Sequence, residues 1–210
     1  MSCHVKMAFG TSIVWLFLSQ FSQSTRYGRN SYNAYTFIAL LLAKFYFLHK
    51  YALSLSKYMS LLLNWINLLI NCVSLGNHIH DSVTTGIGQY FSVQEATPFL
   101  RLITGNVRLE DSFDLSILNE NPMIPQSSLA FYLERLTREE NLAAVVIMNG
   151  MTISLVEQNN NIIVMDSHLH GQLGAMVGII SIDRIEQLLI FVKQQLSPHF
   201  NICSLTFVNY

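Results

Sequence analysis

The stretch LAAVVIMNGMTISLVEQNNNIIVMDSH, residues 142–168, predicts three consecutive antiparallel strands. Leu142–Met148 is rich in β-branched residues and is followed by Asn149-Gly150, a strong signal for a two-residue hairpin. Met151–Glu157 alternates in the manner of a return strand, and an Asn-rich turn separates it from a third strand, Ile162–Met165. We therefore expect the C-terminal part of the chain to build an antiparallel meander.

The sequence on either side extends this unit. Downstream we expect a loop over Gly171–Gly178, an amphipathic helix over Ile182–Leu196 capped by Asp183, and a closing strand over Cys203–Val208. Upstream the periodicity predicts four helices, over Tyr35–Leu48, Leu53–Leu75, Ser92–Ile103 and Ser128–Glu140, and a loop over 104–126. Gly76-Asn77 is expected to end the second helix, and Ser92 and Glu95 have the spacing of a capping box at the start of the third.

Helices followed by an antiparallel meander are typical of an α+β fold. We expect helices on one side of a twisted, mostly antiparallel sheet built from the last 70 residues. A single domain over 26–210 fits the length. Residues 1–25 are either an apolar leader or the first element, because the run Ala8–Leu18 suits a signal core or a buried strand and is too short to span a bilayer.

Composition excludes several classes of protein. Apolar residues make up 51% of the 210 residues and charged residues 12%, so a disordered chain is excluded. The net charge is −1 and no dense Lys/Arg run occurs, so we expect no nucleic-acid partner. Three scattered cysteines, Cys3, Cys72 and Cys203, are too few for a disulfide framework or a cysteine-based zinc site. We expect Cys72 and Cys203 to be buried thiols.

The charges are unevenly divided along the chain. Residues 1–80 carry six bases and no acid, formally +6, whereas residues 81–210 carry six bases and all thirteen acids, formally −7. A basic, apolar front half raises the possibility of membrane contact. In the longest uncharged run, Met59–Asn77, three asparagines lie on one helical face: Asn64, Asn67 and Asn71. The apolar face that we expect to be buried consists of Leu62, Leu63, Ile66, Leu69, Ile70 and Val73. We therefore favour an amphipathic helix and a cytoplasmic protein over a membrane-associated one.

The main chemical candidate is Asp166-Ser167-His168, at the end of the third predicted strand. Residues i and i+2 of a strand point to the same face, so Asp166 and His168 are expected to lie side by side. A carboxylate beside an imidazole fixes the tautomer of the ring and stabilises its charged form, as a general base requires. A polar strand end without chemistry is the alternative.

The order of the segments resembles a known family. An Asn-rich turn opens the first apolar helix (residues 28–40), helices with Trp65 and Gly76-Asn77 follow, then the segment 90–96, and finally the hairpin and Val164–His168. This order resembles papain-like cysteine peptidases of the deubiquitinase kind, in particular the group similar to the ubiquitin-specific protease of the herpesvirus large tegument protein. The resemblance implies a nucleophilic Cys at the start of the first core helix, with His168 as base and Asp166 as its orienting partner. A helix N-terminus favours a thiolate and an oxyanion.

The sequence departs from that pattern at the nucleophile, because no Cys lies between Cys3 and Cys72. The resemblance places Ala34 or Tyr35 in that position, with Ser31 in a less favourable register. Alanine has no nucleophilic atom, and a phenol with a pKa of about 10 is a poor acyl-transfer nucleophile. We therefore expect a degenerate, inactive deubiquitinase-like protein that binds ubiquitin or another protein tail.

Two alternatives remain open. The first is an active hydrolase that uses Ser31 or a cysteine absent from this chain, and the second is a membrane-associated interaction protein. The histidine pairs in His78–Asp81 and Asp166–His170 have spacings that suit zinc, but nothing in the sequence requires the two clusters to meet. Gly86-Ile87-Gly88 lacks the partners of a phosphate loop. We expect no metal and no other cofactor.

Overall fold

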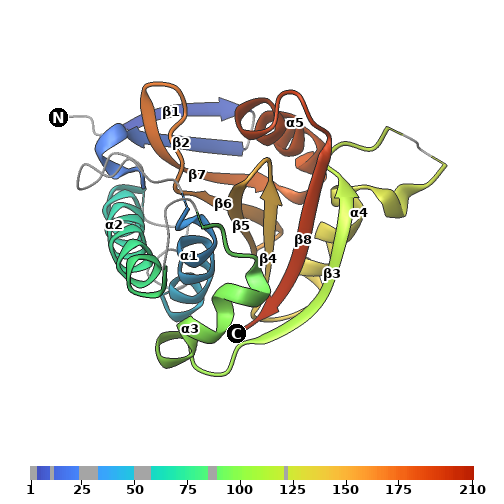
Figure 1. The fold of residues 1–210 in the computed structure, drawn as a ribbon. Coiled ribbons are helices and arrows are strands. Elements are labelled where there is room, and N and C mark those ends of the chain that lie inside the picture. The colour runs from blue at the N-terminus through green and yellow to red at the C-terminus, as the bar shows by residue number, and fades with distance from the viewer. Residues whose placement is uncertain (1–3, 10–11, 24–32, 50–57, 85–88, 121–122) are drawn as a thin grey trace.

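An eight-stranded antiparallel sheet with helices on both faces forms the molecule (Figure 1). The structure, a computed structural model, describes residues 4–9, 12–23, 33–49, 58–84, 89–120 and 123–210. The strands are β1 (His4–Phe9), β2 (Ser12–Leu18), β3 (Arg108–Ser116), β4 (Leu142–Met148), β5 (Met151–Gln158), β6 (Asn161–Asp166), β7 (Leu173–Ser181) and β8 (Ile202–Asn209). The helices are α1 (Tyr35–His49), α2 (Tyr58–Val83), α3 (Val93–Thr104), α4 (Leu129–Leu133) and α5 (Ile185–Leu196).

The predicted hairpin is confirmed and lies at the centre of the sheet. The strand order is β1-β2-β7-β6-β5-β4-β8-β3. Met148 pairs with Met151 across the turn, and Asn149 and Gly150 both have positive φ, 50° and 76°, as a type I′ turn requires. The third strand, the closing strand, the helix from Tyr35 and the Ser92–Glu95 capping box are confirmed as well.

The sheet is larger than the last 70 residues, and this part of the prediction is wrong. Strand β2 pairs with β7, and β1 pairs with β2, so residues from the run 8–18 lie in the sheet. The expected loop over 104–126 contains β3, an edge strand that pairs only with β8 among the described strands. Its sequence, RLEDSFDLS, is charged, as is typical of sheet edges.

The expected loop over Gly171–Gly178 is also wrong, because β7 runs through it. Its glycines serve close packing and do not mark a turn. A Cβ at position 174 would lie 2.3 Å from the carbonyl oxygen of Leu18, so only glycine lets β2 approach here.

Helices cover both faces of the sheet, not one face as expected. One core packs α1, α2 and α3 against residues such as Val145, Val156 and Ile163. The second core packs α4 and α5 against the alternate residues, including Ala144, Leu155 and Val164. Because neighbouring residues of a strand point to opposite faces, near-continuous apolar strands indicate burial on both sides.

Helix α2 does not stop at Gly76-Asn77 but continues to Val83, which corrects the prediction. A Cβ at position 76 would lie 2.5 Å from Cγ1 of Ile38, so the glycine allows α1 and α2 to approach closely. Asn67 and Asn71 are exposed and Trp65 is fully buried, as an amphipathic helix requires, although Leu63 is exposed and not buried as expected. Among the helices that the structure describes, none has the length and apolarity to cross a membrane.

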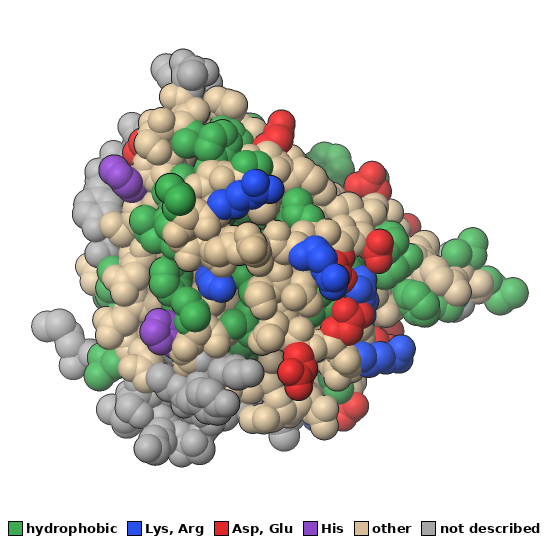
Figure 2. Space-filling view, turned by 90° about the horizontal axis from the view of Figure 1, so that it is seen from below, with side chains coloured by type: hydrophobic (Ala, Val, Ile, Leu, Met, Phe, Trp, Pro, Cys, Tyr) green, Lys and Arg blue, Asp and Glu red, His purple; other side chains and the backbone are tan. Residues whose placement is uncertain are grey.

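Two further helix predictions need correction. The expected helix Ser128–Glu140 is a short α4 followed by a 3-10 turn over Glu134–Thr137. Helix α5 begins at Ile185, after a 3-10 turn that contains Asp183, and it has no side-chain cap. On the face seen in Figure 2, the acidic side chains gather mainly on the side of β3 and α4, in line with the uneven charge along the sequence.

Candidate functional site

The Asp166–His168 pair is formed where β6 ends. The backbone N–H of His168 donates to Oδ1 of Asp166 at 2.8 Å, and Nδ1 of the same imidazole contacts that oxygen. Strand β6 ends at Asp166, so His168 lies in the turn that follows the strand. The two side chains are therefore brought together by a turn that the Asp166 side chain stabilises and not, as the sequence predicted, by the alternation of residues in a strand. Both residues are buried, with exposed fractions of 0% and 2%.

A second imidazole lies against the other oxygen of the carboxylate. Nε2 of His170 is 3.2 Å from Oδ2 of Asp166, within ion-pair distance but without hydrogen-bond geometry. The backbone of His170 is fixed by two hydrogen bonds with Leu173. Burial favours the neutral form of the Asp166 carboxyl, but the charge and hydrogen bonding of His168, followed by the interaction with His170, outweigh it and lower the pKa of Asp166.

The start of α1 meets this pair, where the family resemblance implied that it would. The ring of Tyr35, the first residue of α1, lies against the imidazole of His168 with 3.7 Å between the ring centroids and an interplanar angle of 39°. Ala34 precedes it, is 1% exposed, and its carbonyl accepts the N–H of Ile38 at 3.0 Å. Four predicted site residues, Ala34, Tyr35, Asp166 and His168, are therefore brought together, and Ser31 lies outside the described residues.

The other polar side chain on the first turn of α1 is engaged elsewhere. The hydroxyl of Thr36 donates to the carbonyl of Phe91 at 2.7 Å and lies 3.2 Å from the hydroxyl of Thr152. The cysteines that the structure describes lie away from this turn: Cys72 is in the core between α2 and the sheet, and Cys203 is in the opposite core. The described part of the site thus holds an oriented imidazole without a thiol beside it.

The imidazole keeps one nitrogen available. Nε2 of His168 is buried and forms no hydrogen bond with the described residues, while Nδ1 faces the carboxylate. A carboxylate at Nδ1 favours the tautomer in which Nε2 accepts a proton. The pair therefore has the chemistry of a general base, covered by the ring of Tyr35.

Gln23 is a candidate site residue that sequence reasoning missed. Its backbone N–H donates to the carbonyl of Ser167 at 2.9 Å, so it lies next to the Asp166–His168 turn. Its side chain is fully buried, and neither amide atom has a hydrogen-bond partner among the described residues. The Gln/Ser-rich character of residues 19–24 was the available signal, but a pairing across more than 140 positions leaves no trace in local spacing.

The described residues contain no group of three His, Cys, Asp or Glu side chains that could hold a metal ion. His80, from the first histidine cluster, is buried against Phe37 and Phe91, and its ring nitrogens face the carbonyl of Gln89 and the hydroxyl of Thr84. Its ring packs in the helical core and takes no part in a joint site with Asp166 and His168.

Comparison with known proteins supports the fold. The structure is similar to the crystal structure of the ubiquitin-specific protease encoded by a murine cytomegalovirus tegument protein, solved in complex with a ubiquitin-based suicide substrate. The TM-score is 0.58, the sequence identity is 13%, and the match covers 91% of this chain and 83% of that chain. No protein-family model matches the sequence, and no curated protein matches it either. At this identity the likeness establishes the papain-like fold and no more.

Proposed function

We propose that this protein is a deubiquitinase-like cysteine peptidase without its nucleophile, and that it binds ubiquitin or another protein tail without cleaving it. The observation that carries the proposal is the contact between Tyr35 and His168. In an acyl-transfer site the base must reach a nucleophile at hydrogen-bond distance. Here an aromatic ring from the first turn of α1 covers the imidazole.

The choice of ubiquitin as partner rests on resemblance. The structurally similar protease was solved with a ubiquitin-based suicide substrate. The place proposed for such a tail is the junction of α1 and the end of β6, where the ring of Tyr35 lies against His168. Ubiquitin is therefore the first partner to test, and binding is measured by titrating labelled ubiquitin into the purified chain.

The loss of chemistry is tested with ubiquitin that carries a thiol-reactive group at its C-terminus. We expect the unaltered chain to form no covalent adduct. Tyr35→Cys and Ala34→Cys each restore a thiol at the start of α1, and the variant with the correct register is expected to be labelled. Adding His168→Ala to that variant is expected to slow labelling by about 100-fold or more, because general-base catalysis contributes at least this much.

Labelling of the unaltered chain by this probe would overturn the proposal and favour an active hydrolase. A serine-reactive ubiquitin probe, with Ser31→Ala as its control, tests the remaining nucleophile. If neither cysteine variant reacts while both stay folded by circular dichroism, then the start of α1 and His168 do not form a peptidase-type site. Absence of ubiquitin binding would restrict the proposal to other protein tails.

A further inference from the structure

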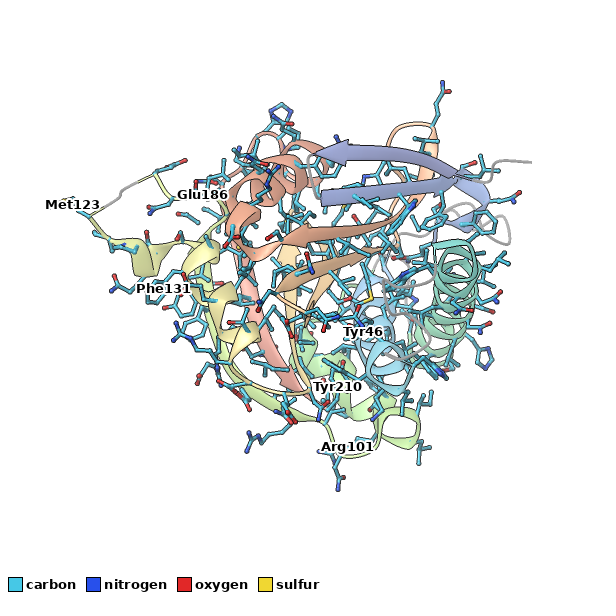
Figure 3. The ribbon with its side chains drawn as sticks, turned by 180° about the vertical axis from the view of Figure 1, so that it is seen from behind. Tyr46, Arg101, Met123, Phe131, Glu186 and Tyr210 are labelled. Atoms are coloured by element: carbon cyan, nitrogen blue, oxygen red, sulfur yellow. The ribbon has the colours of Figure 1, made fainter. Side chains whose placement is uncertain are left out.

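A cavity of about 430 Å³ lies at the opposite end of the sheet strands from His168. It is lined by Tyr46 and Phe47 of α1, the start of β4, and the end of β5. Ser154 pairs with Met165 near the Asp166–His168 turn, whereas Gln158 pairs with Asn161 at the other end of β6, so the two sites are separate. Figure 3 shows Tyr46 between α1 and the sheet.

The cavity is acidic. Glu139, Glu140 and Glu157 line it, and its described lining contains no Lys or Arg. Arg135 pairs with Glu139, and Glu157 accepts the backbone N–H of Asn160 at 2.7 Å. Glu140 is exposed and has no ion pair with the described residues, so the cavity carries uncompensated negative charge.

Tyr46 adds an observation that is independent of the carboxylates. Its side chain is 1% exposed, and its ring is fixed by stacking on Trp65 at 6.1 Å and by an edge contact with Phe47 at 5.4 Å. Its hydroxyl forms no hydrogen bond with the described part of the chain, although the residue lines the cavity. Burial, and then the charge of Glu157, raise the pKa of Tyr46, so the hydroxyl stays neutral. The hydroxyl is not one of the buried polar atoms that lack a partner, so it faces the open space of the cavity, where an N–H group of a ligand would reach it.

We propose that this cavity binds an organic cation, an ammonium or guanidinium group on an alkyl chain. The carboxylates are too dispersed to form a metal site, since the described residues contain no suitable group of three ligands. An alkyl-bound cation fits better, because its stem packs on Tyr46 and Phe47 while its N–H groups donate to Glu140, Glu157 and the hydroxyl of Tyr46. The volume is in the range of small-ligand sites.

Isothermal titration calorimetry with two probes tests the proposal and shows whether the bound cation is a free polyamine or the side chain of a protein. Spermidine represents a free polyamine, and acetyl-Ala-Arg-Ala-amide represents the side chain of a protein tail. The same peptide with citrulline in place of arginine is the uncharged control. Because Trp65 stacks on Tyr46, a change in tryptophan fluorescence on binding is a second measurement.

We expect Glu140→Gln and Glu157→Gln each to weaken binding about tenfold, as the loss of one charge-assisted hydrogen bond requires. Tyr46→Phe keeps the stacked ring and is expected to weaken binding roughly threefold. Glu186 of α5 is not part of the lining of this cavity, so Glu186→Gln makes the same change of charge away from the site and is expected to have no effect (Figure 3). Glu140 is exposed, so its variant keeps the fold.

Binding of either probe with these losses supports the cation site, and the probe that binds identifies the source. The proposal is overturned if neither probe binds at millimolar concentration, if citrulline binds as well as arginine, or if Glu186→Gln weakens binding as much as Glu140→Gln. The measurement does not depend on ubiquitin, so it stands apart from the proposed function.

Discussion

At the scale of single residues, Asp166 is the most constrained ionisable group of the site. It is fully buried between His168 and His170, and these two imidazoles lower its pKa although burial opposes this. We expect Asp166→Asn to lower the free energy of unfolding by about 1–3 kcal/mol at neutral pH, because the imidazoles lose a charged partner. Urea unfolding followed by circular dichroism measures the difference.

The effect of pH has a definite sign. The folded pKa lies below the unfolded value of about 3.9, so the carboxylate stabilises the fold fully above that pH. Below it, the unfolded chain takes up the proton first, and the stabilisation falls by about 1.4 kcal/mol per pH unit. We therefore expect the difference in the free energy of unfolding between the unaltered protein and the Asp166→Asn variant to shrink on acidification. A difference that stays constant down to about pH 2.5 would contradict this account.

The two described cysteines should be inert in the folded protein. Burial raises the pKa of Cys72, and burial together with the charge of Asp114 raises the pKa of Cys203 to about 12. In a Cys3→Ser background we expect neither thiol to react with an aromatic disulfide reagent at about pH 8 until denaturant is added. Mass spectrometry counts the adducts. Rapid labelling of the folded protein would contradict this prediction, because it would show that a buried thiol is accessible to the reagent.

At the scale of elements, the packing of α1 on α2 depends on Gly76. A Cβ there would meet Cγ1 of Ile38 at 2.5 Å and its backbone N at 3.1 Å. Alanine improves helix propensity by about 1 kcal/mol, but overpacking costs about 1–3 kcal/mol. We therefore expect Gly76→Ala to destabilise the protein in chemical denaturation. In the Ile38→Ala background the added penalty should be smaller, and a stabilised Gly76→Ala single variant would refute the close approach.

The elements also show what can be predicted from sequence. The Asn149-Gly150 turn and the Ser92–Glu95 cap were predictable because each is specified by a few adjacent residues. Strand β7 and the length of α2 were not, because Gly174 and Gly76 have meaning only beside their distant partners, Leu18 and Ile38. A glycine that ends an element and a glycine that permits close packing look the same in a single sequence.

The site divides in the same way. The Asp166–His168 pair is local, and the sequence places it correctly, although a turn and not the strand pleat closes it. The contact of Tyr35 with His168 joins segments more than 130 positions apart, and only the resemblance to a family predicted it. Gln23 escaped prediction because its pairing with Ser167 is equally remote, and the Gln/Ser-rich segment around it does not specify a partner.

At the scale of the whole molecule, the sheet joins the first described residues to the last third of the chain. Strand β2 pairs with β7 through Ile13–Leu18, and Trp15 and Phe17 are buried in the core beneath the helices. Gln23 is the second residue after the 3-10 turn that follows β2, and its backbone N–H donates to the carbonyl of Ser167. The N-terminal strands therefore support the same turn that carries His168.

This connection gives a test of whether the first 18 residues are a dispensable leader or part of the domain. A chain that begins at Ser19 exposes the edge of β7 and removes Trp15 and Phe17, whose loss costs about 3–5 kcal/mol each when buried rings are truncated. We expect this shortened chain to aggregate or to lose its cooperative unfolding transition, because an unpaired edge of apolar residues favours intermolecular pairing. Size-exclusion chromatography and thermal circular dichroism measure both effects.

Trp15→Phe in the full chain is the matched control and should remain folded and monomeric. A shortened chain that elutes as a monomer with an unchanged melting temperature would show that the domain begins after β2.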